Sequence, residues 1–165
     1  HAYARQHVAG RPVERVDETR LRIGIVLAHE GGALGKMLTP FRFGLGGRLG
    51  DGRAWMSWIH ADDLVALMLE ALADERWHGP VNAAAPHPVR NADFTRALGR
   101  ALLRPAVLPM PAFLLRALFG EVAETLLASQ RLQAAVMERL SFRCRFPELN
   151  AALANILGRP QQLTR

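Results

Sequence analysis

Residues 19–27 form a largely apolar run, rich in β-branched side chains, that ends shortly before a series of glycines. Such a run is typical of a strand buried on both faces, as in a parallel sheet. Glycine recurs from residue 31 to residue 52, so we expect a mostly irregular segment there, with one helical turn near residues 34–41. Residues 55–60 then predict a second, shorter strand. The chain is therefore expected to build its core around parallel strands.

Helical and strand patterns alternate after residue 60. Asp62 and Asp63 precede a segment of helical spacing, and acidic side chains there cap free N–H groups and complement the helix dipole. The inner face of this helix is expected to hold Leu64, Leu67, Met68, Ala71 and Leu72. Residues 81–85 predict a strand, and Asn91 is expected to cap a helix over residues 92–103. This alternation predicts an α/β architecture.

The sequence pattern changes near residue 105, where several prolines punctuate a short extended piece. Two helical stretches follow within residues 112–140. A short strand over residues 142–146 and a final helix, with Pro147 in its first turn and its end near Gly158, are then expected. We therefore place a soft boundary at this point, followed by a mostly helical module.

Composition limits the partners and the compartment of the chain. The formal net charge of +6 attracts polyanions, but Lys36 is the sole lysine among 21 basic residues and the arginines are scattered without interleaved aromatic residues. Nucleic-acid binding is therefore the weaker interpretation. Cys144 has no second cysteine to pair with, which fits a reducing compartment, by default the cytoplasm. No apolar run has the length of a membrane span, so no membrane partner is expected.

Three glycines, Gly44, Gly47 and Gly50, satisfy the G-x-x-G-x-x-G spacing of dinucleotide-binding loops. Such a motif works between a buried strand and the N-terminus of a helix that meets the pyrophosphate. Here Pro40 precedes the glycines, and Asp51 follows them without a helical pattern opening. The triplet is therefore interpreted as a plain flexible loop and not as a cofactor site.

The sequence His60-Ala61-Asp62-Asp63 raises the question of a metal site. Zinc requires three or four converging ligands, and no second cluster of histidine, cysteine or aspartate lies at ligand spacing. We therefore expect no metal here. A structural role is favoured, in which Trp58 and Ile59 pack inward and the two aspartates cap the following helix.

Six short segments, in this order, resemble the C-terminal part of extended short-chain dehydrogenases/reductases. They read RIGIVL, GGALGKM, GLGG with GDGR, WIHADDLV, GPVNAAAPHPVRN and FRCRFPEL. More narrowly, they resemble bacterial NAD(P)-dependent epimerase/dehydratase-like proteins with an extra helical C-terminus. The resemblance implies an α/β fold: residues 20–104 as the substrate-side half of an extended Rossmann-type reductase/epimerase fold, and residues 105–158 as a small, mostly helical C-terminal module. Residues 1–19 match poorly, and residues 159–165 form a tail.

The resemblance also implies where ligands bind. Ile25 and Val26 belong to the strand that passes the nicotinamide ring of NAD(P), and a plain core role is the alternative for both. The substrate side is implied to include Lys36, Met37, Trp58, His60, His87 and Arg90. Lys36 is suited to an anionic group, with a solvated loop lysine as the alternative. Arg90 can equally be a surface residue beside a helix cap.

The chain departs from the family in two respects. The family's Tyr-x-x-x-Lys pair, which performs general acid–base catalysis, is absent, because Tyr3 and Lys36 are the only residues of their kinds. Met56 and Ser57 stand where the wider superfamily has an arginine and an aspartate beside the substrate, which weakens the expectation of a nucleotide-sugar substrate without removing it. No catalytic residue is therefore assigned.

Together these implications define an expected function. The chain is interpreted as a fragment of an NAD(P)-dependent nucleotide-sugar epimerase/dehydratase-like oxidoreductase that contributes the substrate-binding side for an unidentified small molecule. It is not expected to be active, or to bind NAD(P), alone. A missing N-terminal half or a second copy is expected as its partner, because unpaired sheet edges and apolar faces favour association. The alternative is a non-catalytic protein-interaction module derived from the same fold.

Overall fold

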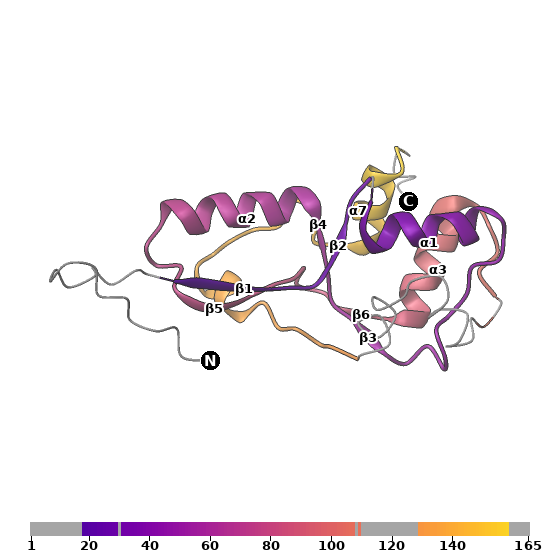
Figure 1. Cartoon of the computed structure of the whole chain (residues 1–165), viewed down its shortest axis with the longest axis horizontal. Coiled ribbons are helices and arrows are strands. Elements are labelled where there is room, and N and C mark those ends of the chain that lie inside the picture. The colour runs from indigo at the N-terminus through magenta and orange to yellow at the C-terminus, as the bar shows by residue number, and fades with distance from the viewer. Residues whose placement is uncertain (1–17, 30, 108, 110–128, 159–165) are drawn as a thin grey trace, which may run out of the picture.

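The structure is a computed structural model of the chain, and it describes residues 18–29, 31–107, 109 and 129–158 (Figure 1). Its elements in chain order are β1 (Thr19–Ile23), β2 (Ile25–Leu27), α1 (Gly32–Arg42), β3 (Trp55–Met56), β4 (Trp58–His60), α2 (Ala61–Ala73), β5 (Gly79–Ala83), β6 (Val89–Arg90), α3 (Asn91–Leu102), α6 (Ala135–Arg139) and α7 (Leu149–Ile156). Figure 1 shows β1, β5 and α2 at one end of an elongated arrangement and α1, α3 and α7 at the other, with β2 and β4 between them. Of the helical stretches predicted within residues 112–140, the part before residue 129 lies outside the described residues. Residues 129–134 are not helical, which corrects the expectation there, and α6 covers Ala135–Arg139.

Each of the two predicted strands, residues 19–27 and residues 55–60, changes its hydrogen-bonded partner strand part-way along its length. At Gly24 the chain leaves β5 and joins β4: the Gly24 N–H donates to Ala83 O at 3.1 Å, and the Ile25 N–H donates to Ser57 O at 2.8 Å. A Cβ at position 24 would lie 2.7 Å from Ser57 O, so this approach requires glycine. The pairs β1–β5 and β2–β4 are parallel, which confirms the expected pairing, and β3 pairs antiparallel with β6.

Strand β1 is less buried than its sequence pattern suggested. Its residues are half-buried or exposed, and Ile23 is 47% exposed. Within the described residues β1 is hydrogen-bonded to β5 alone, and Arg20 and Arg22 reach solvent. The expectation of a strand buried on both faces is therefore wrong for β1, whereas Leu27 at the end of β2 is fully buried.

Two hydrophobic cores lie on opposite faces of β2 and β4. Because successive side chains of a strand point to opposite faces, Ile25 and Leu27 pack in the first core and Val26 packs against the second. In the same way Trp58 enters the first core and Ile59 the second. The first core also contains Leu34, Met37, Leu38, Phe41, Leu49, Met56, Ala85, Phe94, Ala97, Leu98, Leu149, Ala152, Leu153 and Ile156. The second also contains Leu67, Trp77, Val81, Ala83, Ala134 and Met137.

Helix α1 replaces much of the irregular segment that the glycines predicted. It includes Pro40 in its last turn, where the missing N–H removes only one helical hydrogen bond. One face of α1 is buried in the first core through Leu34, Met37, Leu38 and Phe41. Burial of this face outweighs the low helix propensity of glycine and proline, so the expectation of a single helical turn is wrong. Residues 43–52 remain irregular, as expected.

Asn91 does not cap α3, contrary to the sequence-based expectation. It is the first residue of the helix, after Arg90 as the N-cap, and its side chain is buried. Its Oδ1 accepts the backbone N–H of Leu49 at 2.7 Å. Asn91 therefore ties the glycine-rich segment to the start of α3, because a buried backbone N–H needs an acceptor.

Helix α2 turns part of its apolar side chains toward solvent. Leu67 is fully buried and Leu64 and Ala71 pack against the second core, as the helical spacing predicted. Met68 and Leu72 were expected on the same inner face, but they are 45% and 85% exposed. The apolar residues of α2 thus form a wider band than one core covers within the described residues.

Residues 142–146 form no strand, which corrects another expectation. The segment passes α2, where the carboxylate of Asp63 accepts its backbone N–H groups in place of a neighbouring strand. The final helix is confirmed as α7, which ends before Gly158, at a φ of 64°. It begins at Leu149 after Glu148 as the N-cap, so the expectation that Pro147 lies in its first turn is wrong. Because α7 packs in the first core, the C-terminal residues share that core with α1 and α3.

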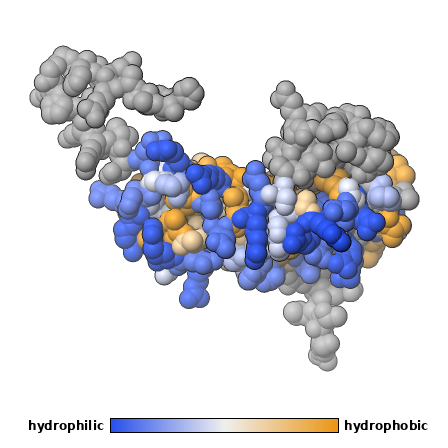
Figure 2. All heavy atoms as spheres, turned by 90° about the horizontal axis from the view of Figure 1, so that it is seen from below, coloured by the Kyte–Doolittle hydropathy of each residue, from blue (hydrophilic) through white to orange (hydrophobic). Residues whose placement is uncertain are grey.

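The surface of the molecule carries both hydrophilic and hydrophobic residues. Figure 2 shows a face on which hydrophilic residues predominate, with patches of hydrophobic residues between them. No helix among the described residues is both long and apolar enough to cross a membrane.

Candidate functional site

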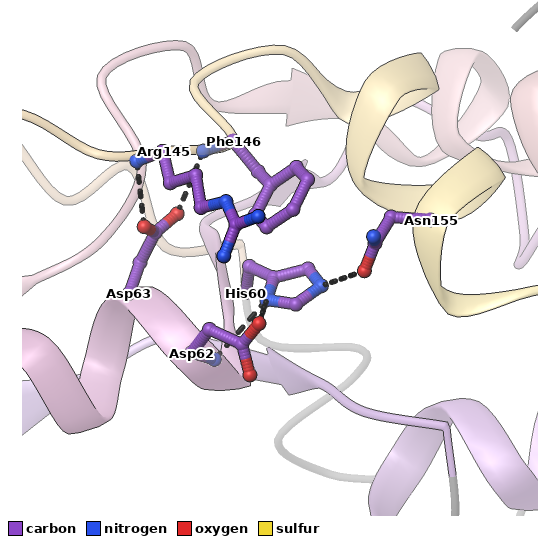
Figure 3. A network of polar contacts seen from close by, with 6 residues as sticks. All are labelled: His60, Asp62, Asp63, Arg145, Phe146 and Asn155. Atoms are coloured by element: carbon purple, nitrogen blue, oxygen red, sulfur yellow. Dashed lines mark hydrogen bonds and ion pairs between the residues drawn. The ribbon is translucent and has the colours of Figure 1, made fainter.

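His60 stands where β4 ends and α2 begins, and it connects three parts of the chain (Figure 3). The side chain is buried, and its Nδ1 accepts the backbone N–H of Asp62 at 3.1 Å, which caps α2. With Nδ1 as an acceptor, the neutral ring carries its proton on Nε2, which lies 3.2 Å from Asn155 Oδ1 and donates to it. The ring also stacks on Phe146, with centroids 4.2 Å apart.

Asp63 fastens the C-terminal segment to α2. Its buried carboxylate accepts the backbone N–H of Arg145 at 2.6 Å and that of Phe146 at 3.0 Å. The sequence predicted that Asp62 and Asp63 cap α2, and this is wrong, because His60 is the N-cap. Both carboxylates still lie in the first turn, where they complement the helix dipole.

Trp58 and His87 are joined by a hydrogen bond. The indole of Trp58 is fully buried in the first core, as the inward packing predicted, and its Nε1–H donates to the carbonyl of His87 at 3.2 Å. The His87 side chain is exposed, and its Nε2 lies 3.4 Å from Glu148 Oε1. Beside these two side chains a polar cavity of ≈ 330 Å³ opens between α3 and the start of α7. Trp58 thus positions the backbone from which His87 projects.

Arg90 lies on the ring of Trp55. Its guanidinium carbon is 3.8 Å from the ring centroid, and Nη1 donates to the carbonyl of Arg53 at 2.5 Å. A second guanidinium, that of Arg131, lies 4.6 Å from the same centroid. No sequence pattern indicates the contact with Arg131, because the two arginines are brought together only by the pairing of distant segments.

The remaining predicted residues lie apart from this group. Lys36 is exposed on α1, whereas its neighbour Met37 is buried in the first core. Ile25 and Val26 are half-buried on β2 and pack against different cores. The roles of these four residues toward substrate or cofactor stay predictions.

The glycine triplet Gly44, Gly47 and Gly50 does not fit a dinucleotide pyrophosphate. The glycine triplet lies between α1 and β3, in a segment that ends in a strand and not at a helix N-terminus. A Cβ at Gly46, within this loop, would lie 2.4 Å from the ring of Phe41, so the close approach made by this loop is to its own core. Among the described residues, no three histidine, cysteine, aspartate or glutamate side chains are grouped to hold a metal ion.

Cys144 is not set up as a nucleophile. It packs against the second core, and this burial, together with the negative charge of Asp63, raises its pKa to about 11. The thiol is therefore protonated at neutral pH, whereas a reactive cysteine needs a lowered pKa.

Known proteins are similar to this chain in both sequence and fold. Residues 110–156 match a family described as a domain of unknown function, DUF1731. An epimerase family protein of Mycobacterium leprae is 44% identical over 142 residues, which are 86% of this chain and 46% of that protein. The chain spans about half the length of the curated relatives it matches.

Two solved structures are similar to this chain in both fold and sequence. The crystal structure of the human epimerase family protein SDR39U1 (isoform 2) with NADPH matches with a TM-score of 0.82 and 38% identity, over 89% of this chain and 50% of that one. A nucleoside-diphosphate sugar epimerase from Corynebacterium glutamicum matches with a TM-score of 0.64 and 38% identity, over 84% and 25%. The expected fold class, part of a Rossmann-type α/β fold, is confirmed. The chain therefore corresponds to the C-terminal portion of epimerase family proteins of the short-chain dehydrogenase/reductase type.

Proposed function

We propose that this chain is the substrate-side portion of an NAD(P)-dependent, nucleotide-sugar epimerase/dehydratase-like oxidoreductase of the cytoplasm, and that it is not active alone. The observation that carries the proposal is the match of 89% of the chain to half of a relative crystallised with NADPH. The match to a protein described as a nucleoside-diphosphate sugar epimerase supports the substrate class. The cofactor site belongs, in this proposal, to residues outside the chain, because the glycine triplet leads into β3 and not into the N-terminus of a helix.

Within this proposal the chain holds and orients polar groups for a substrate. NAD(P) supplies hydride transfer when it is bound to the complete fold. His60 and Asp63 fix the C-terminal segment against β4 and α2, and Trp58 fixes the carbonyl of His87. His87 and Arg90, which lie at either end of the short segment leading into α3, then present their side chains to solvent as substrate contacts.

NADPH binding tests the proposal. The chain is joined to the portion of the Mycobacterium leprae relative that it does not match, and binding is followed by the fluorescence of the reduced nicotinamide. The joined protein is expected to bind NADPH, and the 165-residue chain alone is expected not to bind. Binding by the isolated chain would contradict the assignment of the cofactor site to other residues. A folded joined protein that neither binds NADPH nor turns over any nucleotide sugar would contradict the function itself.

A non-catalytic interaction module is the second candidate, and one surface favours it. On α2 the exposed residues Val65, Met68, Leu69 and Leu72 recur at helical spacing, which makes one apolar stripe. Within the described residues β1 also lacks a strand on its second edge. Sedimentation velocity of the isolated chain and of Leu69→Glu separates the two candidates. If both forms are stable monomers, and the unsubstituted chain captures a defined protein through the stripe without NADPH, the interaction module is favoured.

A further inference from the structure

Two arginines from distant parts of the chain converge on Trp55, and the geometry points to a binding site for a phosphate-bearing small molecule at Trp55, Arg90 and Arg131. Both guanidinium carbons lie within 5 Å of one ring centroid, at 3.8 Å and 4.6 Å. This inference rests on the proposed function, in which Arg90 contacts the substrate, and it adds Trp55 and Arg131 to that contact. The cavity beside His87 and Glu148 is lined by none of these three residues.

The backbone, and not chance contact, places these side chains. Trp55 and Arg90 are direct partners in the antiparallel pair β3–β6, so their side chains lie on one face of it. Met56, the next residue of β3, points the other way and is buried in the first core. The face that carries Trp55 is therefore the outer face of β3.

Hydrogen bonds hold Arg131 over the same ring. The Trp55 N–H donates to Ser129 Oγ at 3.0 Å, and the Gln130 N–H donates to Trp55 O at 3.3 Å. Ser57 Oγ donates to Gln130 O at 2.9 Å and accepts the Leu132 N–H at 2.8 Å. The residues on both sides of Arg131 are thus anchored to Trp55 and Ser57, which reduces the entropy lost when its guanidinium binds a ligand.

The charge of the pair is not neutralised by the described residues. No carboxylate among them forms an ion pair with Arg90 or Arg131, and Asp51, which is close along the chain, pairs with Arg53 at 3.9 Å. Two like charges on one ring repel each other, and a bound anion would remove this cost. A guanidinium stacked on an indole keeps the edge of its plane free to donate, and two such forks suit the oxygens of a phosphate or diphosphate.

Inorganic pyrophosphate is the probe for the isolated chain at constant ionic strength. The chain has three tryptophans, of which Trp58 and Trp77 are buried, so the indole N–H resonance of Trp55, assigned with Trp55→Phe, reports on the site. Pyrophosphate is expected to shift this resonance with saturation, and chloride is not. Arg131→Gln and Arg90→Gln are each expected to weaken binding about tenfold.

Two further variants keep the site falsifiable. Arg22→Gln removes an equal charge from the exposed strand β1 and is expected to leave binding unchanged. Arg131→Lys keeps the charge but loses the planar fork, so it is expected to bind as weakly as Arg131→Gln. Absence of any shift at Trp55, or an equal loss in Arg22→Gln, would overturn the site. Full binding by Arg131→Lys would reduce it to general charge attraction and would overturn it as well.

Discussion

The two hydrophobic cores differ in how the exposed apolar side chains beside them are arranged. The first is enclosed by α1, α3 and α7, and its buried side chains come from both ends of the described chain. The second lies beside α2, β5 and α6, where the stripe on α2 and Ile23 of β1 remain exposed. The second core also contains Trp77 Nε1, a buried N–H for which the described residues offer no acceptor.

This difference bears on the proposed function. Exposed apolar side chains also follow the C-terminal ends of α1 and α3 beside the first core, namely Phe43, Leu45, Leu103 and Val107. Only those of α2 recur at helical spacing beside a strand with one unpaired edge, which is typical of a surface that meets more protein. The relatives are about twice as long as the matched region. We therefore propose that the side of α2 and β1 faces the part of the family fold that this chain does not match.

Replacement of a leucine by alanine is expected to change the free energy of unfolding far more in the first core than on the apolar stripe of α2. Leu153→Ala opens a cavity in the first core and is expected to lower the free energy of unfolding by about 2–5 kcal/mol. Leu72→Ala, at a side chain that is 85% exposed, is expected to change it by less than about 0.5 kcal/mol. Urea denaturation of both variants measures the difference. Similar losses in the two would mean that the stripe is already covered in solution, most simply by a second copy, which sedimentation would detect.

Removal of the Asp63 carboxylate tests the link between the two regions. Asp63→Ala leaves the N–H groups of Arg145 and Phe146 without their acceptor, which is expected to lower the free energy of unfolding by about 1–3 kcal/mol. Hydrogen exchange at these two amides is expected to quicken more than exchange in α3. Asp62→Ala is the matched control, because that side chain is exposed, and its loss is expected to stay below about 1 kcal/mol. Equal effects of the two variants would refute the anchoring role of Asp63.

Cys144 is expected to give the smallest effect. The reactivity of its thiol measures whether this part of the second core is closed to solvent. With its pKa at about 11, the folded thiol is expected to react slowly with iodoacetamide at pH 8 and rapidly in urea. The unfolded chain loses this proton near the ordinary pKa of 9.0, so stability is expected to fall as the pH rises from about 9 to about 11. Alkylation of the folded chain at the rate seen in urea would show that this part of the core is open.

The sequence predicted elements best where a local pattern and the tertiary environment agree. The parallel strands and the final helix were predicted because apolar runs and a glycine that ends a helix act locally. The expectation failed for α1, because glycine and proline signal irregular structure while burial of Phe41 and its neighbours stabilises a helix. It also failed for the strand over residues 142–146, because the carboxylate that satisfies its amides belongs to α2.

The residues of the candidate site also fall into those that could be named from the sequence and those that depend on distant contacts. His60, Trp58, His87 and Arg90 were named from the sequence, and the structure joins Trp58 to His87 and Arg90 to Trp55. Arg131 and Asn155 were not named, because nothing in their own segments indicates which distant residue they contact. Met37 was expected beside the substrate, and the structure shows that it lies in the first core.

The α/β class, the parallel strands and the relationship to epimerase family proteins could be predicted from the sequence, because apolar periodicity and ordered short motifs are local properties of the chain. The packing of distant segments was needed to show that His60 and not an aspartate caps α2, that Asp63 holds a segment more than eighty residues away, and that two arginines share one tryptophan. Hydrogen bonds, stacking and burial act over a few ångströms, and the packing of the whole chain decides which residues meet at that distance.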